Sequence, residues 1–403
     1  MIDWSFRLPD IYKPTPKIDD PLRILVLGYL VRGPLGGLAW HHLQYVVGLT
    51  RLGHDVYFLE DSDNYDSCYD PDRGLMGTDP TYGLGFTAQT FDKAGLTDQW
   101  AYYDAHTNSW LGPAADRSLE ICDTADLLLN VSGVNPLRPW LMEVPVRAFI
   151  DTDPAFTQIR HLTDPAAYQL ASQHTHFLTF AENIGRRTCK IPDDHFPWQP
   201  TRQPIVLPAW PVLPGPEGGK LTTVMQWDSY ATREFNGVQY GMKSESFAPY
   251  LELPTTTETA FELALGSASA PRDLLLKKGW QLVDPLTISR TPWSYQDYIQ
   301  QSKAEFSVAK QGYVISHGGW FSERSACYLA SGRPVVVQNT GFSEWMKTGA
   351  GVIAFSSPDQ ALAGIAAIND SYHFHCQAAR AIAEEYFDAR KVLLQLIEFT
   401  MQN

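Results

Sequence analysis

Proline dominates one segment in the middle of the chain. Eight prolines fall within residues 192–216 of a chain of 403 residues. Proline fixes φ and carries no backbone N–H, so such a segment forms neither a continuous helix nor a central strand. A single hydrophobic core rarely grows beyond about 250 to 300 residues, so a chain of this length needs two. We therefore predict two domains, residues 20–210 and 215–375, with helices over residues 376–403 that pack back on the first domain.

Each half alternates short apolar runs with helical patterns. In the first half, residues 23–28 form a β-branched run that ends in glycine, residues 38–52 place apolar side chains at helical spacing, and residues 55–59 resume as a strand. This order predicts parallel strands covered by helices. The second half repeats the alternation, with strand-like runs over residues 221–227, 261–266, 280–284, 304–309 and 334–339. The expected α/β fold is two Rossmann-like, doubly wound domains facing each other across a cleft.

The charge of the chain limits its partners. A net charge of −14 argues against nucleic acid, because phosphate backbones need a basic surface. The five cysteines lie far apart without a CxxC pair, so neither a disulfide framework nor a cysteine zinc site is expected. The start of the chain has no secretory pattern, and no run reaches about 18 apolar residues. We expect a cytoplasmic protein without a membrane span. The sequence does not set its oligomeric state.

The segment of residues 309–342 carries the strongest chemical signal. An extended run leads to a glycine pair, Ser322 stands at an N-cap position, a helix follows to about Ser331, and Gly332 and Pro334 lead into a strand. A glycine loop before a helix N-terminus is suited to bind an anion, because free N–H groups and the positive end of the helix dipole converge there. The ligand expected is a phosphate or diphosphate. The alternative is a crossover helix that is only well capped.

The same residues resemble a known family. The run from His317 to Ser322 is similar to the HCGWNS stretch in the nucleotide-sugar box of plant secondary product glycosyltransferases. Gly332, Arg333 and Pro334, with the valines that follow, resemble the GxPVV motif of GT-B glycosyltransferases generally. The resemblance covers about 35 residues. It departs from the family at Phe321, where the family has asparagine, and at Glu323, which comes earlier than the family glutamate.

The resemblance implies a GT-B fold and a function. The chain would transfer a sugar from a nucleoside diphosphate sugar, such as a UDP-sugar, to a small-molecule acceptor. Neither a metal nor a cofactor would be needed, since the nucleotide sugar is a co-substrate. The histidine, the glycines, the tryptophan and the serine would contact the donor diphosphate, and the glutamate would hold the ribose. The implied donor residues are His317, Gly318, Gly319, Trp320, Ser322 and Glu323.

Two lysines are candidates for the charge of the leaving diphosphate. Lys310, just upstream of the glycine pair, could neutralise that charge as it develops. The alternative for Lys310 is a solvated surface lysine. Lys243 is a second candidate on the same argument.

The first half offers candidates for the acceptor side. Gly36 and Gly37 follow the first strand, at the edge of the sheet where open α/β folds bind ligands. His41 and His42 come next, and either could be a general base if its pKa lies near the working pH. The alternative for this pair is helix packing. Asp151 closes another strand and is a third catalytic candidate, able to bind acceptor hydroxyls or orient a histidine.

Two other functions remain open from the sequence. A nucleotide-sugar epimerase of the same fold would use the same donor loop, and product analysis separates it from a transferase. A non-catalytic nucleotide-sugar binding protein would bind the donor tightly without transferring or hydrolysing it.

Overall fold

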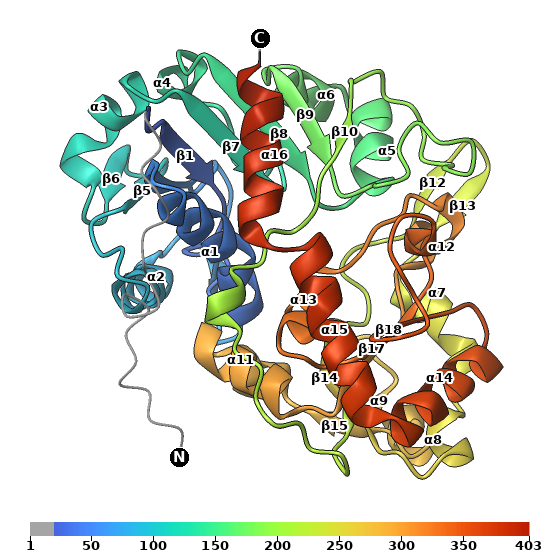
Figure 1. The fold of residues 1–403 in the computed structure, drawn as a ribbon. Helices are drawn as coiled ribbons and strands as arrows, with labels where there is room; N and C mark the ends of the chain where they lie inside the picture. The colour runs from blue at the N-terminus through green and yellow to red at the C-terminus, as the bar shows by residue number, and fades with distance from the viewer. Residues whose placement is uncertain (1–19, 403) are drawn as a thin grey trace.

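The structure is a computed structural model, and it describes residues 20–402. The start of the chain, on which the expectation about a secretory segment rests, lies outside these residues. Two separate parallel sheets organise the rest (Figure 1). Within the described residues, no helix combines the length and the apolar character needed to cross a bilayer.

The first sheet has eight strands in the order β10-β9-β8-β7-β1-β2-β5-β6. All neighbouring pairs are parallel except β5 and β6. The strands are β1 (Arg23–Leu27), β2 (Asp55–Asp61), β5 (Trp100–Asp104), β6 (Ser109–Leu111), β7 (Leu127–Val131), β8 (Val146–Asp151), β9 (His176–Thr179) and β10 (Gln199–Pro200). The chain runs outward from β1 in both directions, so the order switches between β1 and β7. Ligands of open α/β sheets bind at such a point.

Both faces of this sheet are buried. Ile24 and Val26 of β1 belong to one apolar cluster, and the alternate residues Leu25 and Leu27 belong to another. A strand whose two faces are both covered needs a continuous apolar run, which explains the sequence RILVL. The helices of this half are α1 (Gly36–Arg51), α2 (Thr81–Lys93), α3 (Ser118–Asp123), α4 (Pro139–Met142), α5 (Phe156–Thr163) and α6 (Pro165–Ala171).

The second sheet has six parallel strands in the order β15-β14-β11-β16-β17-β18. They are β11 (Leu221–Gln226), β14 (Phe261–Gly266), β15 (Gln281–Val283), β16 (Ala304–Ser307), β17 (Val335–Gln338) and β18 (Val352–Phe355). The order switches between β11 and β16. The helices are α7 (Lys243–Phe247), α8 (Leu253–Thr256), α9 (Arg272–Lys277), α10 (Pro285–Ser289), α11 (Pro292–Gln301), α12 (Gln311–Ser316), α13 (Glu323–Ala330), α14 (Pro358–Asp370), α15 (Tyr372–Tyr386) and α16 (Ala389–Met401). The predicted α/β class with doubly wound parallel sheets is confirmed.

Two hairpins extend from this framework. The segment over residues 61–85 contains β3 (Cys68–Asp70) paired antiparallel with β4 (Leu75–Gly77) and the start of α2. In the second half, β12 (Arg233–Phe235) pairs with β13 (Val238–Tyr240) ahead of α7. Short hairpins of this kind carry little periodic signal, because only three residues of each strand pair.

The chain crosses between the halves twice. The proline-rich segment is the first crossing, and the turn between α15 and α16 is the second (Figure 1). The two are hydrogen-bonded to each other, with Ile205 N donating to Phe387 O at 2.7 Å and Ala389 N donating to Ile205 O at 2.9 Å. Beyond this point α16 packs on α1 of the first half, where a Cβ on Gly48 would lie 2.5 Å from Leu393. By contrast, α15 packs on α13 of the second half.

Candidate functional site

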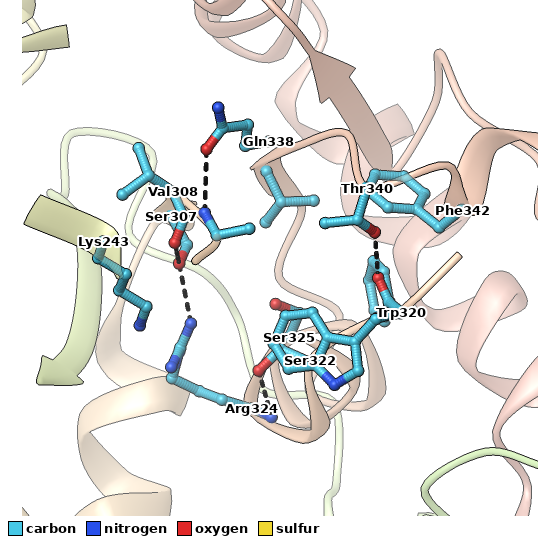
Figure 2. Close-up of a pocket in the computed structure, with 13 residues that line it drawn as sticks. Lys243, Ser307, Val308, Trp320, Ser322, Arg324, Ser325, Gln338, Thr340 and Phe342 are labelled. Atoms are coloured by element: carbon cyan, nitrogen blue, oxygen red, sulfur yellow. Dashed lines mark hydrogen bonds between the residues drawn. The ribbon is translucent and has the colours of Figure 1, made fainter. Parts of the chain in front are cut away.

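A pocket opens at the carboxyl ends of β16 and β17, beside the switch point of the second sheet (Figure 2). The glycine loop, the N-terminus of α13 and the loop after β17 contribute most of the wall. The lining residues are Lys243, Ser307, Val308, Ala309, Trp320, Phe321, Ser322, Arg324, Ser325, Val337, Gln338, Thr340 and Phe342.

The N-terminus of α13 faces this pocket in a defined way. Ser322 is the N-cap, and its hydroxyl accepts a hydrogen bond from Arg324 N at 3.3 Å. Trp320 and Ser322 both line the pocket, as the sequence predicted for a donor site. The positive end of the helix dipole therefore points at the cavity, which favours an anion there.

Arg324 supplies a buried guanidinium at the base of the pocket. It donates to Glu305 Oε1 at 2.7 Å, to Ser307 Oγ at 2.9 Å and to Val224 O at 2.9 Å. Each partner comes from a strand next to the switch point. The charge of Arg324 is thus balanced by Glu305, and its geometry is fixed by three acceptors.

Lys243 supplies a second cation, and no carboxylate of residues 20–402 forms an ion pair with it. No hydrogen bond or ion pair joins its ammonium to any residue that the structure describes. Burial, together with the like charges of Arg324 and Lys310, lowers the pKa of Lys243 to about 7. Figure 2 shows its side chain extending toward Arg324. An ammonium in this position is stabilised by any anion that enters the pocket.

Lys310 is held at the boundary between the two halves. Its ammonium bonds Asp153 Oδ1 at 2.8 Å and Tyr230 OH at 2.8 Å, and Tyr313 OH also donates to Asp153. Burial opposes the charge of Asp153, but Lys310 and the two tyrosine hydroxyls lower its pKa below the ordinary value. Lys310 is therefore not a solvated surface lysine. The ion pair of Lys310 with Asp153 joins the segment after β16 to the segment after β8.

The glycine pair approaches the first half of the protein rather than a cavity. A Cβ on Gly319 would lie 2.8 Å from Asn183 Cγ, and one on Gly318 would lie 2.6 Å from Ile191 Cδ1. Asn183 Nδ2 donates to His317 O at 3.2 Å and to Gly341 O at 3.0 Å. The close backbone approach that the sequence implied is thus made to another part of the chain.

His317 lies at the surface. It ends α12 in the left-handed conformation, with φ of 50°, and its side chain is exposed. It is not among the residues that line the pocket. The predicted contact of His317 with the donor diphosphate stays a prediction, as does that of the two glycines.

A second, smaller cavity lies between the two halves. α1, α11 and α13 form its walls. The cavity brings His41 and Glu323 together across the domain boundary, and Arg324 lines both this cavity and the first. Glu323 does not line the pocket that holds Lys243. The lining residues are Gly37, Trp40, His41, Gln44, Gln203, Tyr295, Glu323, Arg324 and Cys327.

The structure separates the two histidines of α1. His42 is fully buried, its Nδ1 bonds Leu38 O of the same helix at 2.8 Å, and its ring contacts Phe58. Burial lowers the pKa of His42 well below its ordinary value. His41 instead lines the small cavity. Burial lowers the pKa of His41 as well, while the charge of Glu323 acts in the opposite direction. His42 therefore packs inside the first half, whereas His41 lines a cavity between the halves.

Asp151 is enclosed at the end of β8. It accepts hydrogen bonds from Gln158 Nε2 at 3.0 Å, Thr179 Oγ1 at 2.8 Å and Asp153 N at 2.9 Å. Burial raises its pKa against these bonds. Asp151 lines neither cavity and shapes the turn that presents Asp153. Its predicted catalytic role stays a prediction without support from this geometry.

Gly36 and Gly37 serve the contact between α1 and α11. A Cβ on Gly36 would lie 2.3 Å from Thr291 O, and one on Gly37 would lie 3.2 Å from the Tyr295 ring. Trp40 Nε1 donates to Pro292 O at 2.7 Å beside them. The two glycines let α1 approach the second half, and Gly37 also lines the small cavity.

The loop after β1 is folded around an internal carboxylate that the sequence did not single out. Backbone N–H groups of Leu30, Val31 and Arg32 donate to Glu60 at 2.6, 2.8 and 2.7 Å. Glu60 ends the run DVYFLE on the neighbouring strand β2. The sequence does carry a signal for Glu60, since an acidic residue near the end of an apolar strand is unusual and the neighbouring strand is followed by a loop that contains glycine. The anion-binding position of this loop is occupied by the protein itself.

Among residues 20–402, no group of three or more His, Cys, Asp or Glu side chains could hold a metal ion. The expectation that neither metal nor cofactor takes part is not tested by this observation and stays a prediction.

Comparisons with known proteins place the chain by its fold. No family model matches the sequence, and no curated protein matches it. Solved structures do match. An alpha-glucosyltransferase in complex with UDP and a 13-mer DNA containing a HMU base has a TM-score of 0.59 at 9% identity, over 95% of this chain and 100% of that chain. Anabaena Alr3699/HepE in complex with UDP-glucose has a TM-score of 0.55 at 11% identity, over 94% and 99%. AviGT4, a glycosyltransferase involved in avilamycin A biosynthesis, has a TM-score of 0.51 at 12% identity, over 95% and 98%.

These likenesses confirm the predicted GT-B fold of glycosyltransferases over nearly the whole chain. One of the similar proteins is in complex with DNA. The expectation that nucleic acid is not a partner of this chain therefore stays a prediction.

Proposed function

We propose that the chain is a glycosyltransferase that moves a sugar from a nucleoside diphosphate sugar to a small-molecule acceptor. The donor diphosphate would lie in the pocket between Lys243, Arg324 and the N-terminus of α13. Ser322 and Trp320, which line the same pocket, would contact the donor as well.

One observation carries this proposal. The partly buried ammonium of Lys243 lies beside a guanidinium and at the positive end of a helix, and none of the described carboxylates forms an ion pair with it. Glu305 forms an ion pair with Arg324, whereas no carboxylate of the described residues pairs with Lys243. A diphosphate supplies the missing negative charge, and each favourable contact with it strengthens as charge develops on the leaving group.

The similar proteins support the choice of ligand. Two of them, the alpha-glucosyltransferase and the Anabaena protein, are in complex with UDP and with UDP-glucose. A UDP-sugar is accordingly the first donor to test.

The charges of the protein support two further parts of the proposal, namely a small acceptor and a reaction that needs no metal. A chain with a net charge of −14 repels a polyanion, so we propose a small acceptor rather than nucleic acid. Lys243, Arg324 and the helix dipole would stabilise the departing diphosphate in place of a divalent cation, and the nucleotide sugar would act as co-substrate. No cofactor enters this scheme.

A binding and transfer panel tests the proposal. Calorimetry would measure UDP-sugar binding to the wild type, to Lys243→Met and to Lys277→Met. Lys277 is an exposed lysine of α9 in the same half, so its variant controls for loss of a lysine charge. We expect binding by the wild type and the control, and a loss of about 1.5 to 3 kcal/mol for Lys243→Met, the range for a hydrogen bond to a charged group. Equal affinity of all three proteins would contradict the donor site.

Product analysis separates the proposal from its alternatives. Transfer of the sugar to an added acceptor supports a transferase. A changed sugar on an intact nucleotide would identify an epimerase, and tight binding without turnover over hours would identify a binding protein.

A further inference from the structure

Gln203 of the proline-rich segment has a side-chain amide whose orientation is fixed by its partners. Its Nε2 lies 3.1 Å from His41 O and 3.1 Å from Pro204 O. Both partners are backbone carbonyl oxygens, which only accept hydrogen bonds, so the NH₂ group must face them. The carbonyl oxygen Oε1 therefore points the other way, toward the ring of His41.

This orientation settles which nitrogen of His41 carries the proton. Gln203 Oε1 lies 2.6 Å from His41 Nδ1. An amide oxygen accepts, so Nδ1 must be the donor of this hydrogen bond. In the neutral imidazole the other nitrogen, Nε2, then holds the free lone pair. No residue of the described range 20–402 forms a hydrogen bond with His41 Nε2.

The free nitrogen belongs to a ring that lines the cavity between the halves. Glu323 lies on the opposite wall, and Arg324 connects this cavity to the pocket with Lys243. Gln203 and His41 are both buried, which keeps their hydrogen bond from being exchanged with water. His41, whose Nε2 has no partner among residues 20–402, therefore lines a cavity that shares Arg324 with the proposed donor site.

We propose that Gln203 is a positioning residue that holds His41 in the Nδ1–H tautomer, so that Nε2 accepts the proton of the acceptor hydroxyl. This inference rests on the proposed function. During transfer, the acceptor oxygen bonds to the anomeric carbon of the sugar, and the bond from that carbon to the phosphate oxygen breaks. The electron pair leaves with the nucleoside diphosphate, and the hydroxyl proton moves to His41 Nε2.

The surroundings of His41 keep the ring neutral and ready to accept a proton. Burial lowers its pKa, and the opposing effects of Glu323 and of the Gln203 hydrogen bond do not reverse this. A neutral amide orients the ring without adding the charge that a carboxylate in the same place would bring. The titratable groups that face His41 from the packed elements are His42 and Tyr45 on α1, Tyr295 on α11, and Glu323, Arg324 and Cys327 on α13.

Two variants of Gln203 form a matched pair. Gln203→Met and Gln203→Glu both lose the donor group that bonds the two carbonyl oxygens, so both suffer the same structural loss. Only Gln203→Glu keeps an oxygen that can accept from His41 Nδ1. If the role of Gln203 were only structural, the glutamate variant would be at least as damaged as the methionine variant, because its carboxylate faces two carbonyl oxygens.

Nitrogen NMR of the full-length protein labelled with ¹⁵N-histidine reads the tautomer directly, without substrate. His41→Ala identifies the signals of His41. We expect the Nδ1–H tautomer in the wild type and in Gln203→Glu, and loss of that preference in Gln203→Met. An Nε2–H tautomer in the wild type, or an unchanged spectrum for Gln203→Met, would overturn the inference.

Turnover supplies the second readout. With UDP-glucose or another donor from the binding panel, His41→Ala should lower kcat by about 100- to 10,000-fold, the range for a general base, at unchanged donor affinity. Gln203→Met should also lose most of its turnover, and Gln203→Glu should recover much of it. Equal losses in the two Gln203 variants would contradict the positioning role. If the wild type transfers no sugar, the proposed function fails, while the NMR result still decides the tautomer.

Discussion

At the scale of single residues, two lysines of the second half differ in their surroundings. Lys310 has a counterion, Asp153, and is held by it. Lys243 has none within the part of the chain that the structure describes, and it lies beside Arg324. A lysine without a partner in a partly buried site gains most from a bound anion, whereas a lysine already paired must exchange one carboxylate for another anion. The electrostatics therefore favour Lys243 over Lys310 as the first donor contact, the reverse of the order that the sequence suggested.

The lowered pKa of Lys243 predicts proton uptake on donor binding. With a pKa of about 7, Lys243 is mostly neutral at pH 8 in the free protein, and a diphosphate would bind its charged form. Binding of a UDP-sugar at pH 8 should then take up nearly one proton, and affinity should fall by up to about tenfold per pH unit above pH 7. Calorimetry in buffers of different ionisation enthalpy measures this uptake. Lys243→Met should abolish it, and uptake that persists in this variant would have to come from another group.

Gly319 and Gly185 allow a controlled test of the glycine loop. Both have φ of +78°, but a Cβ on Gly319 would meet Asn183, whereas one on Gly185 would meet nothing within 4 Å. The cost of left-handed backbone, about 1 to 2 kcal/mol for a residue with a Cβ, is common to both. Gly319→Ala should therefore lower the free energy of unfolding by more than Gly185→Ala does. Denaturant titration measures both. Equal losses of unfolding free energy would show that Asn183 moves to make room for the added methyl group.

At the scale of elements, the loop between β1 and α1 is organised by a strand that is not adjacent to it in sequence. Glu60 at the end of β2 accepts three backbone N–H groups of this loop. Arg32 Nε also lies 3.4 Å from the same carboxylate. These contacts fix the conformation of the loop, in which the Tyr29 ring packs against His42.

Replacing this carboxylate by an amide should destabilise the first half. In Glu60→Gln, one oxygen becomes an NH₂ group that would face a backbone N–H, leaving a buried donor unpaired. We expect a loss of about 1 to 3 kcal/mol in the free energy of unfolding. Glu143→Gln, at an exposed position after α4, is the control and should change it by less than about 0.5 kcal/mol. Similar values for the two variants would mean that the loop does not depend on the charge of Glu60.

At the scale of the whole molecule, the two halves are joined by partly buried polar contacts as well as by the chain. Asp153 and Lys310 form an ion pair, Trp320 Nε1 donates to Thr152 O at 3.2 Å, and Asn183 bonds the glycine loop. All three contacts join the carboxyl edge of the first sheet to the segment between β16 and α13. These contacts hold the two halves together on this side of the molecule.

A double-mutant cycle on Asp153→Asn and Lys310→Met measures the ion pair between the halves. We expect a coupling of about 0.5 to 3 kcal/mol in the free energy of unfolding at pH 7. Because folding lowers the pKa of Asp153, this stabilisation is present above the ordinary carboxylate value of about 3.9 and is lost as the pH falls through the lower folded value. A coupling near zero at pH 7, or one unchanged in strong acid, would contradict the assignment.

The sequence predicted the features that are local in the chain. The β-α-β order and the proline-rich segment are visible because strand and helix periods repeat within a few residues, and Ser322 is recognisable as an N-cap from its neighbours. Contacts between distant residues left no such pattern. The sequence shows that Gly319 permits a close approach, but it does not show that Asn183 is what approaches. Gln203 looked like an ordinary residue between prolines, since its partner His41 lies 162 positions away.

Because α16 packs back on the first half, the first half cannot reach its final fold until the end of the chain has been synthesised. α1 ends at Arg51 and the helix that covers it begins at Ala389, so 337 residues lie between them. At about 5 to 20 residues per second, the ribosome needs on the order of 20 to 70 s to bridge that distance. Throughout this interval α16 is not yet available to pack on the apolar side of α1. The nascent first half is therefore the part of the chain that a chaperone, or another nascent copy, would reach first.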